Sequence, residues 1–169
     1  MEDDLAVIER VIAEHKTIRQ GFHKLEQVAN DAEAMTSFEE AKEAFMPGRL
    51  DQKQGLRKLE DTLGAIEEGL QKHFHFEEIS LPTVVDRHGD EELKSSLKSI
   101  LLEHADLRNR LNHSKNHAAE LASGGMARHH WEAAAHDMRA YISHTRKLLE
   151  THAGIEQTLL QELRNRLQK

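Results

Sequence analysis

The segment LKSSLKSILLEHADLRNRL, residues 93–111, has an apolar residue at every third or fourth position. This spacing is the period of an amphipathic helix, whose apolar face packs against a core. One position on that face is a histidine, because His104 falls in register between Ile100 and Leu107. The segment therefore predicts a helix with a titratable side chain built into its buried face.

Three more segments show the same helical spacing with a histidine on the apolar face. The four stripes run over residues 5–25 with His15, 56–81 with His73, 93–121 with His104, and 138–163 with His152. The chain has only two prolines and few aromatic residues, which also favours helices. Short loops between neighbouring helices favour antiparallel packing. We therefore expect an all-α protein, a single domain over residues 1–169 folded as an up-down-up-down four-helix bundle.

The connection between the first two helices is expected to be long. The first stripe predicts a helix that ends near Asn30, which leaves residues 31–52 to the connection. Within it, the sequence favours a short helix at Phe38–Phe45, followed by a Met46-Pro47-Gly48 turn.

The later helices have clearer breaks. Residues 86–90, which contain a glycine, are expected to separate the second and third helices, and Ser123-Gly124-Gly125 the third and fourth. Pro82 lies inside the second stripe and cannot donate a backbone hydrogen bond. It predicts a kink or loosened turns near Glu78.

Composition narrows the classes of protein that the chain can belong to. The formal net charge is −7 and the pI is about 6.0, which argues against nucleic-acid binding. The chain has no cysteine, so thiolate metal sites are excluded. Its acidic N-terminus lacks the pattern of a signal peptide, and no apolar stretch approaches the ~20 residues that span a bilayer. We expect a cytoplasmic protein that binds neither nucleic acid nor membranes.

The four histidines fall at one depth of such a bundle. His15 and His104 lie about 12 residues after the start of their helices, and His73 and His152 lie about 13 to 15 residues before the end of theirs. In an up-down-up-down bundle these starts and ends are at the same end. At ~1.5 Å per residue, all four histidines are therefore about 18–22 Å from that end. We therefore expect the four imidazoles to share one layer of the core.

Two glutamates belong to the same layer. His73 and His152 each open a His-x-x-x-Glu motif, with Glu77 and Glu156 one helical turn later on the same face. An ionised carboxylate among apolar residues is costly to bury unless it meets a cation. Imidazole suits iron, zinc, copper and nickel, and a carboxylate can bridge two ions. Four histidines and two glutamates are therefore enough to hold two metal ions.

The order of these motifs resembles that of the hemerythrin-like family, also called HHE cation-binding domains. The resemblance extends from Leu5 to about Leu163, and the pieces that carry it are Glu14-His15, His73-Phe-His-Phe-Glu77-Glu78 with Leu81-Pro82, Glu103-His104, and His152-Ala-Gly-Ile-Glu156. It implies a hemerythrin-like four-helix bundle with two non-heme iron ions joined by an oxo or hydroxo bridge. The metal ligands that it implies are His15, His73, Glu77, His104, His152 and Glu156. Zinc is the metal that these ligand types leave open as an alternative.

The third helix departs from the pattern of the oxygen carriers. Oxygen-carrying hemerythrins are similar except for a second histidine one turn after the first, where this chain has Arg108. Reversible oxygen carriage therefore cannot be inferred from the resemblance. The pattern is closer to hemerythrin-like domains associated with iron or oxygen sensing, nitric oxide response and iron-centre repair. Repair members usually carry an added cysteine-containing module, which disfavours that role here.

The function expected from these features is the binding or sensing of O2, NO or iron. One alternative is a di-iron oxidase or peroxidase that consumes O2 or peroxide. Another is a helical interaction module whose metal is structural or absent. No residue outside the metal layer is an evident general base, so the sequence predicts no catalytic residue, and it identifies no protein partner.

Neighbouring residues suggest how the layer is supported. The pieces at residues 14–19 and 103–108 both read Glu-His-x-x-Ile/Leu-Arg, which predicts an approximate two-fold axis and two near-equivalent metal positions. Glu78 is either an exposed acid or a supporting or alternative ligand. For Arg19 and Arg108, an ion pair with a glutamate and a role in holding an anion or water both remain open.

Other histidines are less suited to be metal ligands. His113 and His117 have a metal-capable spacing but flank the third stripe, so they are expected to be surface residues. His75 follows His73 by two residues and therefore points to a different side of the helix. Neither feature predicts a further metal site.

Overall fold

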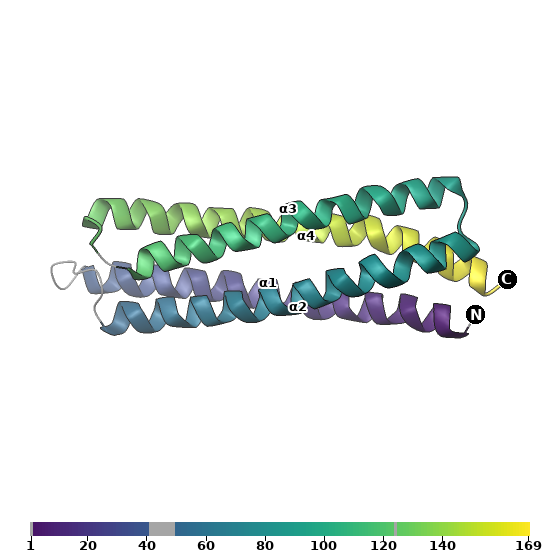
Figure 1. Ribbon diagram of the computed structural model, residues 1–169. Coiled ribbons are helices and arrows are strands. Elements are labelled where there is room, and N and C mark those ends of the chain that lie inside the picture. Colours follow the sequence, from purple (N-terminus) through teal and green to yellow (C-terminus); the bar gives the residue numbers. More distant parts are fainter. Residues whose placement is uncertain (1, 41–49, 124) are drawn as a thin grey trace.

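The fold is a bundle of four long helices. The structure, a computed structural model, describes residues 2–40, 50–123 and 125–169, with side chains for 3–29, 55–123 and 125–169. The helices are α1 (Glu2–Glu40), α2 (Leu50–His88), α3 (Glu91–Ala122) and α4 (Arg128–Leu167). The described part of the chain contains no strand. An all-α four-helix bundle, as expected from the spacing of apolar residues, is confirmed (Figure 1).

The helices are arranged in a ring. Each packs against the next along the chain, and α1 also packs against α4, whereas α2 and α4 touch only slightly across the diagonal. Figure 1 shows both termini and the α2–α3 connection at one end of the bundle, and the α3–α4 connection at the other. At ~1.5 Å per residue, helices of 32 to 40 residues make the bundle roughly 50–60 Å long. No described helix combines the length and the apolar character needed to cross a membrane.

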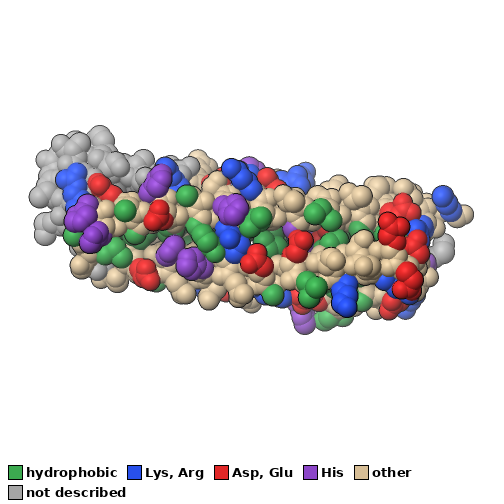
Figure 2. Space-filling model, turned by 90° about the horizontal axis from the view of Figure 1, so that it is seen from above, with side chains coloured by type: hydrophobic (Ala, Val, Ile, Leu, Met, Phe, Trp, Pro, Cys, Tyr) green, Lys and Arg blue, Asp and Glu red, His purple; other side chains and the backbone are tan. Residues whose placement is uncertain are grey.

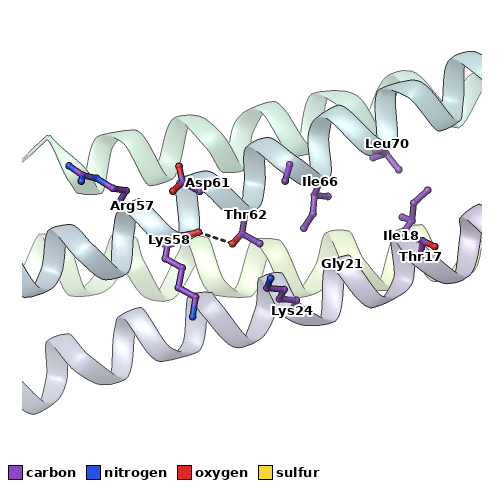
Figure 3. A pocket seen from close by; sticks show the side chains of 12 residues that line it. Thr17, Ile18, Gly21, Lys24, Arg57, Lys58, Asp61, Thr62, Ile66 and Leu70 are labelled. Atoms are coloured by element: carbon purple, nitrogen blue, oxygen red, sulfur yellow. Dashed lines mark hydrogen bonds between the residues drawn. The ribbon is translucent and has the colours of Figure 1, made fainter.

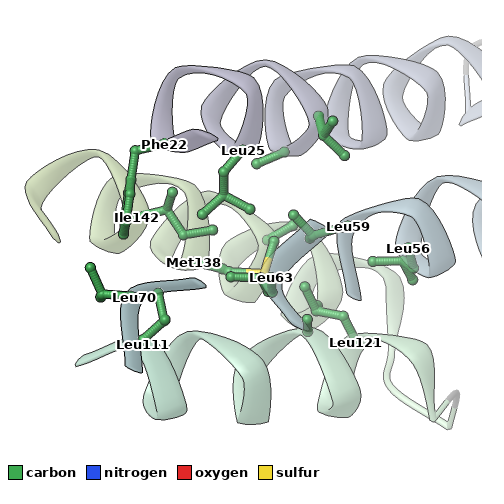
Figure 4. Close-up of a cluster of buried hydrophobic side chains, with 14 of the residues drawn as sticks. Phe22, Leu25, Leu56, Leu59, Leu63, Leu70, Leu111, Leu121, Met138 and Ile142 are labelled. Carbon is green, nitrogen blue, oxygen red and sulfur yellow. The ribbon is translucent and has the colours of Figure 1, made fainter. Parts of the chain in front are cut away.

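The buried apolar side chains form two clusters at different levels of the bundle. The first lies toward the α3–α4 connection and includes Phe22, Leu59, Leu63, Met138 and Ile142 (Figure 4). The second lies toward the termini and includes Ile8, Leu81, Val84, Leu160 and Leu163. Between them lies a layer of buried histidine and glutamate. The core is therefore two apolar blocks separated by one polar layer.

Ion pairs and a cap hold the end of the bundle at the termini. Asp4 of α1 accepts from Arg87 at 3.0 Å and from His88 at 2.8 Å, both at the end of α2. Asp90 caps α3 by accepting from the backbone N–H of Leu93 at 3.0 Å, and it pairs with Arg166 of α4 at 2.7 Å. These contacts join α1 to α2, and the start of α3 to α4, at one end of the bundle.

The α2–α3 connection is shorter than expected. Residues 86–88 belong to α2, so only Gly89 and Asp90 separate the two helices, and the prediction of a break over residues 86–90 is wrong in its extent. A Cβ on Gly89 would lie 2.7 Å from the carbonyl oxygen of Val85, closer than real Cβ contacts. Glycine is therefore required for this tight turn.

Helix α2 also continues through Pro82. The proline cannot donate to the carbonyl one turn earlier, which disfavours a helix at this point. However, Leu81, Val84 and Val85 are each no more than 1% exposed in the second apolar cluster. Their burial requires helical spacing, and this packing outweighs the lost hydrogen bond.

The first helix is longer than expected. The structure continues α1 to Glu40, so the predicted end near Asn30 is wrong by a full ten residues. The predicted stripe ends at Leu25, whereas Val28 and Ala29, at 4% and 1% exposed, continue it into the first apolar cluster. Residues 38–40 of the predicted short helix belong to α1, whereas its remainder and the 46–48 turn lie outside the described residues.

Candidate metal centre

Six side chains converge in the polar layer between the two apolar clusters. All six project from the buried faces of their helices, one each from α1 and α3 and two each from α2 and α4. None is more than 8% exposed, and the full set is His15, His73, Glu77, His104, His152 and Glu156. These are the ligands that the resemblance implies, and helical periodicity positions them because each replaces an aliphatic residue on its stripe.

The six side chains form two groups that could each hold a metal ion. In one group, Glu77, His104, His152 and Glu156 offer ligand atoms that all lie within 4.8 Å of one another. In the other, His15, His73 and Glu77 do the same. Because Glu77 belongs to both groups, the two candidate positions are adjacent and share a carboxylate.

The two glutamates lie between two pairs of histidines, His15 with His73 and His104 with His152. Glu77 Oε1 lies 3.0 Å from His15 Nε2 and 2.5 Å from His73 Nε2. Its other oxygen, Oε2, lies 3.1 Å from His104 Nε2. Glu156 Oε2 lies 3.3 Å from His15 Nε2 and 3.4 Å from His152 Nε2. Each carboxylate therefore contacts histidines from both pairs, as a bridging ligand must.

Several atoms of the layer have no hydrogen-bond partner among the described residues. They are buried, and they include both Glu156 oxygens, Glu77 Oε2 and the Nε2 atoms of His104 and His152. Some lie within ion-pairing distance of each other but are not aligned for a hydrogen bond. An unmade hydrogen bond at a buried polar atom costs about 1–3 kcal/mol. Imidazole nitrogen and carboxylate oxygen are donors that suit transition metals, so these residues fit a metal centre.

The charges of the layer perturb its titration. Burial acts to lower the pKa of His15, but the nearby carboxylates of Glu156 and Glu77 outweigh it and raise the pKa to about 9. For Glu77, burial acts to raise the pKa, and the three histidines around it hold it well below the usual range. Without metal, therefore, a proton on His15 offsets part of the negative charge of the buried carboxylates. A metal ion would replace this proton as the positive charge.

A second set of carboxylates holds the outward nitrogens of the histidines. His73 Nδ1 donates to Glu14 Oε2 at 2.7 Å, and His152 Nδ1 donates to Glu103 Oε2 at 2.7 Å. Because an ionised carboxylate only accepts, each Nδ1 carries the proton and Nε2 is left free to face the layer. Such contacts fix the orientation and raise the basicity of a metal-binding histidine.

A third histidine is held in the same way. His104 Nδ1 donates to Glu78 Oε1 at 3.0 Å, and Arg108 Nη1 donates to the same oxygen at 2.8 Å. The two interpretations of Glu78 are thereby resolved in favour of a supporting acid, and Arg108 forms the ion pair with glutamate that was one of its two expected roles. Phe74 covers the other side of the imidazole, stacked on His104 at 3.9 Å between ring centroids.

Glu14 and Glu103 were recognised in the sequence only as parts of Glu-His motifs, and their role as supporting acids was not predicted. The signal was the repetition of the Glu-His pair on two helices. Each glutamate contacts a histidine on the next helix rather than its own neighbour, so only the packing of helices reveals the role.

Among the side chains that the structure describes, the remaining histidines form no comparable site. His113 and His117 lie one turn apart with ring centroids at 4.3 Å, yet no described His, Asp or Glu completes a group of three with them. His75 is exposed and outside both groups. Figure 2 shows histidines gathered on the surface over the half of the bundle nearer the α3–α4 connection. These surface histidines lack the buried carboxylates of the polar layer.

A small cavity adjoins the layer. It has a volume of about 20 Å³, room for about one water-sized molecule, and His15, His73 and His152 form part of its wall. A larger open groove of about 660 Å³ lies between α1 and α2 (Figure 3). Ile18 and Leu70 line both spaces, so these two side chains lie between the groove and the polar layer.

Comparison with known proteins adds no identification. No family model, no curated protein and no solved structure matches the chain. Function is therefore inferred from the chemistry and geometry of the buried layer, and from the resemblance in the order of its motifs.

Proposed function

We propose that the chain is a non-heme di-iron protein of the hemerythrin-like type that binds or senses O2, NO or iron. The observation that carries the proposal is the pair of overlapping ligand groups that share Glu77. Two histidines from each side and two glutamates between them would supply four protein ligands to each ion. Carboxylate-bridged pairs inside helical bundles favour iron over zinc.

The surroundings of the layer fit a small ligand. When bound, two adjacent irons supply redox chemistry and open positions for a diatomic molecule. The chain provides a buried site and, beside His15 and His73, a cavity of about 20 Å³. This volume is that of about one water-sized molecule, which fits a ligand as small as O2, NO or peroxide. Glu14, Glu103 and Glu78 orient the imidazoles and keep the proton on their outward nitrogens.

The first test is the metal content of the chain after expression in iron-supplemented medium, measured by elemental mass spectrometry. We expect about two irons per chain. The double variant Glu77→Ala with Glu156→Ala removes both shared carboxylates and is expected to lose both ions. A matched control, Glu60→Ala with Glu92→Ala, removes two exposed glutamates and should keep the wild-type content.

Two results would contradict this proposal. One is the absence of metal even after anaerobic reconstitution with ferrous iron, which would favour a helical interaction module. The other is equal metal content in the double variant and the wild type, which would place the iron elsewhere. Loaded protein is then exposed to O2, NO and peroxide: a stable adduct supports binding or sensing, and sustained consumption supports the oxidase or peroxidase.

A further inference from the structure

The metal layer has a near two-fold repeat that relates the α1–α2 half of the chain to the α3–α4 half. His15 corresponds to His104, and Glu14, which supports the histidine of the next helix, corresponds to Glu103. The two His-x-x-x-Glu motifs of α2 and α4 correspond in the same way. Both halves therefore supply one shared carboxylate and one supported histidine of the same kind.

One supporting contact breaks this repeat. His104 Nδ1 is held by Glu78, the residue after Glu77, on the neighbouring helix. The equivalent support for His15 would come from the residue after Glu156, which is Gln157. Gln157 is exposed and carries no charge, and His15 Nδ1 is buried without a hydrogen-bond partner within the described part of the chain.

Because the repeat is broken, the histidines of the two proposed metal positions differ in how their outward nitrogens are held. His104 and His152 both have their outward nitrogens bound to carboxylates, Glu78 and Glu103. In the other pair, His73 has such a partner but His15 has none. A carboxylate on the outward nitrogen fixes the tautomer and makes the imidazole a stronger ligand, and its loss typically weakens metal binding by about 10–100-fold.

We propose that the two metal positions are unequal, with the ion between His104 and His152 held more tightly than the ion between His15 and His73. The missing acid at Gln157 is the cause. This inference rests on the proposed metal site, and it replaces the expectation of two near-equivalent positions. The weaker ion would be the one that exchanges as metal supply changes.

The test uses the metal-free full-length chain and Co2+, under anaerobic conditions, with a chelator as competitor. We expect the wild type to bind two ions in two steps whose dissociation constants differ by roughly tenfold or more. Gln157→Glu supplies the missing acid and should tighten the weaker step toward the stronger one. Glu78→Gln removes the corresponding acid and should weaken the tighter step.

Thr158→Glu is the matched control, because it adds the same charge at the next exposed position of α4. It should leave both steps within about twofold of the wild type. Two equal steps in the wild type would overturn the inference while leaving the two-metal site intact, and so would an equal response to Gln157→Glu and Thr158→Glu. Failure of the wild type to bind Co2+ at all would instead overturn both proposals.

Discussion

The apolar clusters and the polar layer between them are buried to the same degree, yet they contribute to stability in opposite ways. Leu63 and Glu77 lie on the same face of α2, and both are 0% exposed. Burying the leucine removes apolar surface from water and stabilises the bundle by about 1.5–3 kcal/mol. Burying the glutamate requires compensating positive charge from protons or metal. The apolar clusters therefore stabilise the fold, whereas the polar layer lowers its stability unless positive charge compensates the carboxylates.

Among the changes that distinguish the polar layer from the apolar clusters, metal removal should have the largest effect on stability. An ion that binds only the folded chain stabilises it by about 4 kcal/mol when its free concentration is 1,000 times the dissociation constant. We expect a chelator to lower the free energy of unfolding by this order in urea denaturation. The Glu77→Ala, Glu156→Ala variant should show no response to chelator, and an equal response would place the stabilising ion outside the layer.

A cavity in the apolar cluster should cost nearly as much, but independently of metal. Leu63→Ala removes a fully buried side chain and is expected to lower the free energy of unfolding by about 2–5 kcal/mol. The loss should be the same with and without metal. Leu102→Ala, at a leucine 70% exposed, is the matched control and should change stability by less than about 0.5 kcal/mol. A metal-dependent loss at Leu63 would show that the two regions are coupled.

The pH dependence of the metal-free chain should reveal the protons in the layer. The folded chain raises the pKa of His15 from 6.5 to about 9, so it binds this proton more tightly than the unfolded chain does. The resulting stability is fully present below about pH 6.5 and is lost as pH rises through 9. At about 1.4 kcal/mol per pKa unit, the loss is bounded at about 3.5 kcal/mol. Denaturation from pH 6 to 10 should be flatter in His15→Gln, and parallel curves would argue against this origin.

The smallest effect is expected at His113 and His117, of which the first is exposed and the second half-buried. His113 and His117 have the helical spacing of a metal site but contact no buried carboxylate. His113→Ala should keep two irons per chain and change stability by less than about 0.5 kcal/mol. His104→Ala, in the layer, should lose at least one iron in the same elemental measurement. Equal losses from both variants would mean that spacing alone, without burial, holds the metal.

The polar layer was more predictable than the ends of the helices. Its six members could be identified because each interrupts an apolar stripe and all fall at one depth. The end of α1 at Glu40 and the inclusion of residues 86–88 in α2 could not be identified in this way. The predicted apolar spacing extends only to Leu25 and Leu81, whereas Val28, Ala29, Val84 and Val85 are buried beyond those points.

Local spacing along the chain determined the helical bundle, its polar layer and the six candidate ligands, because helical period alone decides which side chains share a face. Only the tertiary structure decided which acid supports which histidine. Glu14 is adjacent to His15 in the chain but bonds His73, 59 residues away, and Glu78 bonds His104, 26 residues away. These contacts depend on how neighbouring helices are aligned along the bundle, and that alignment is set by packing of both apolar clusters at once.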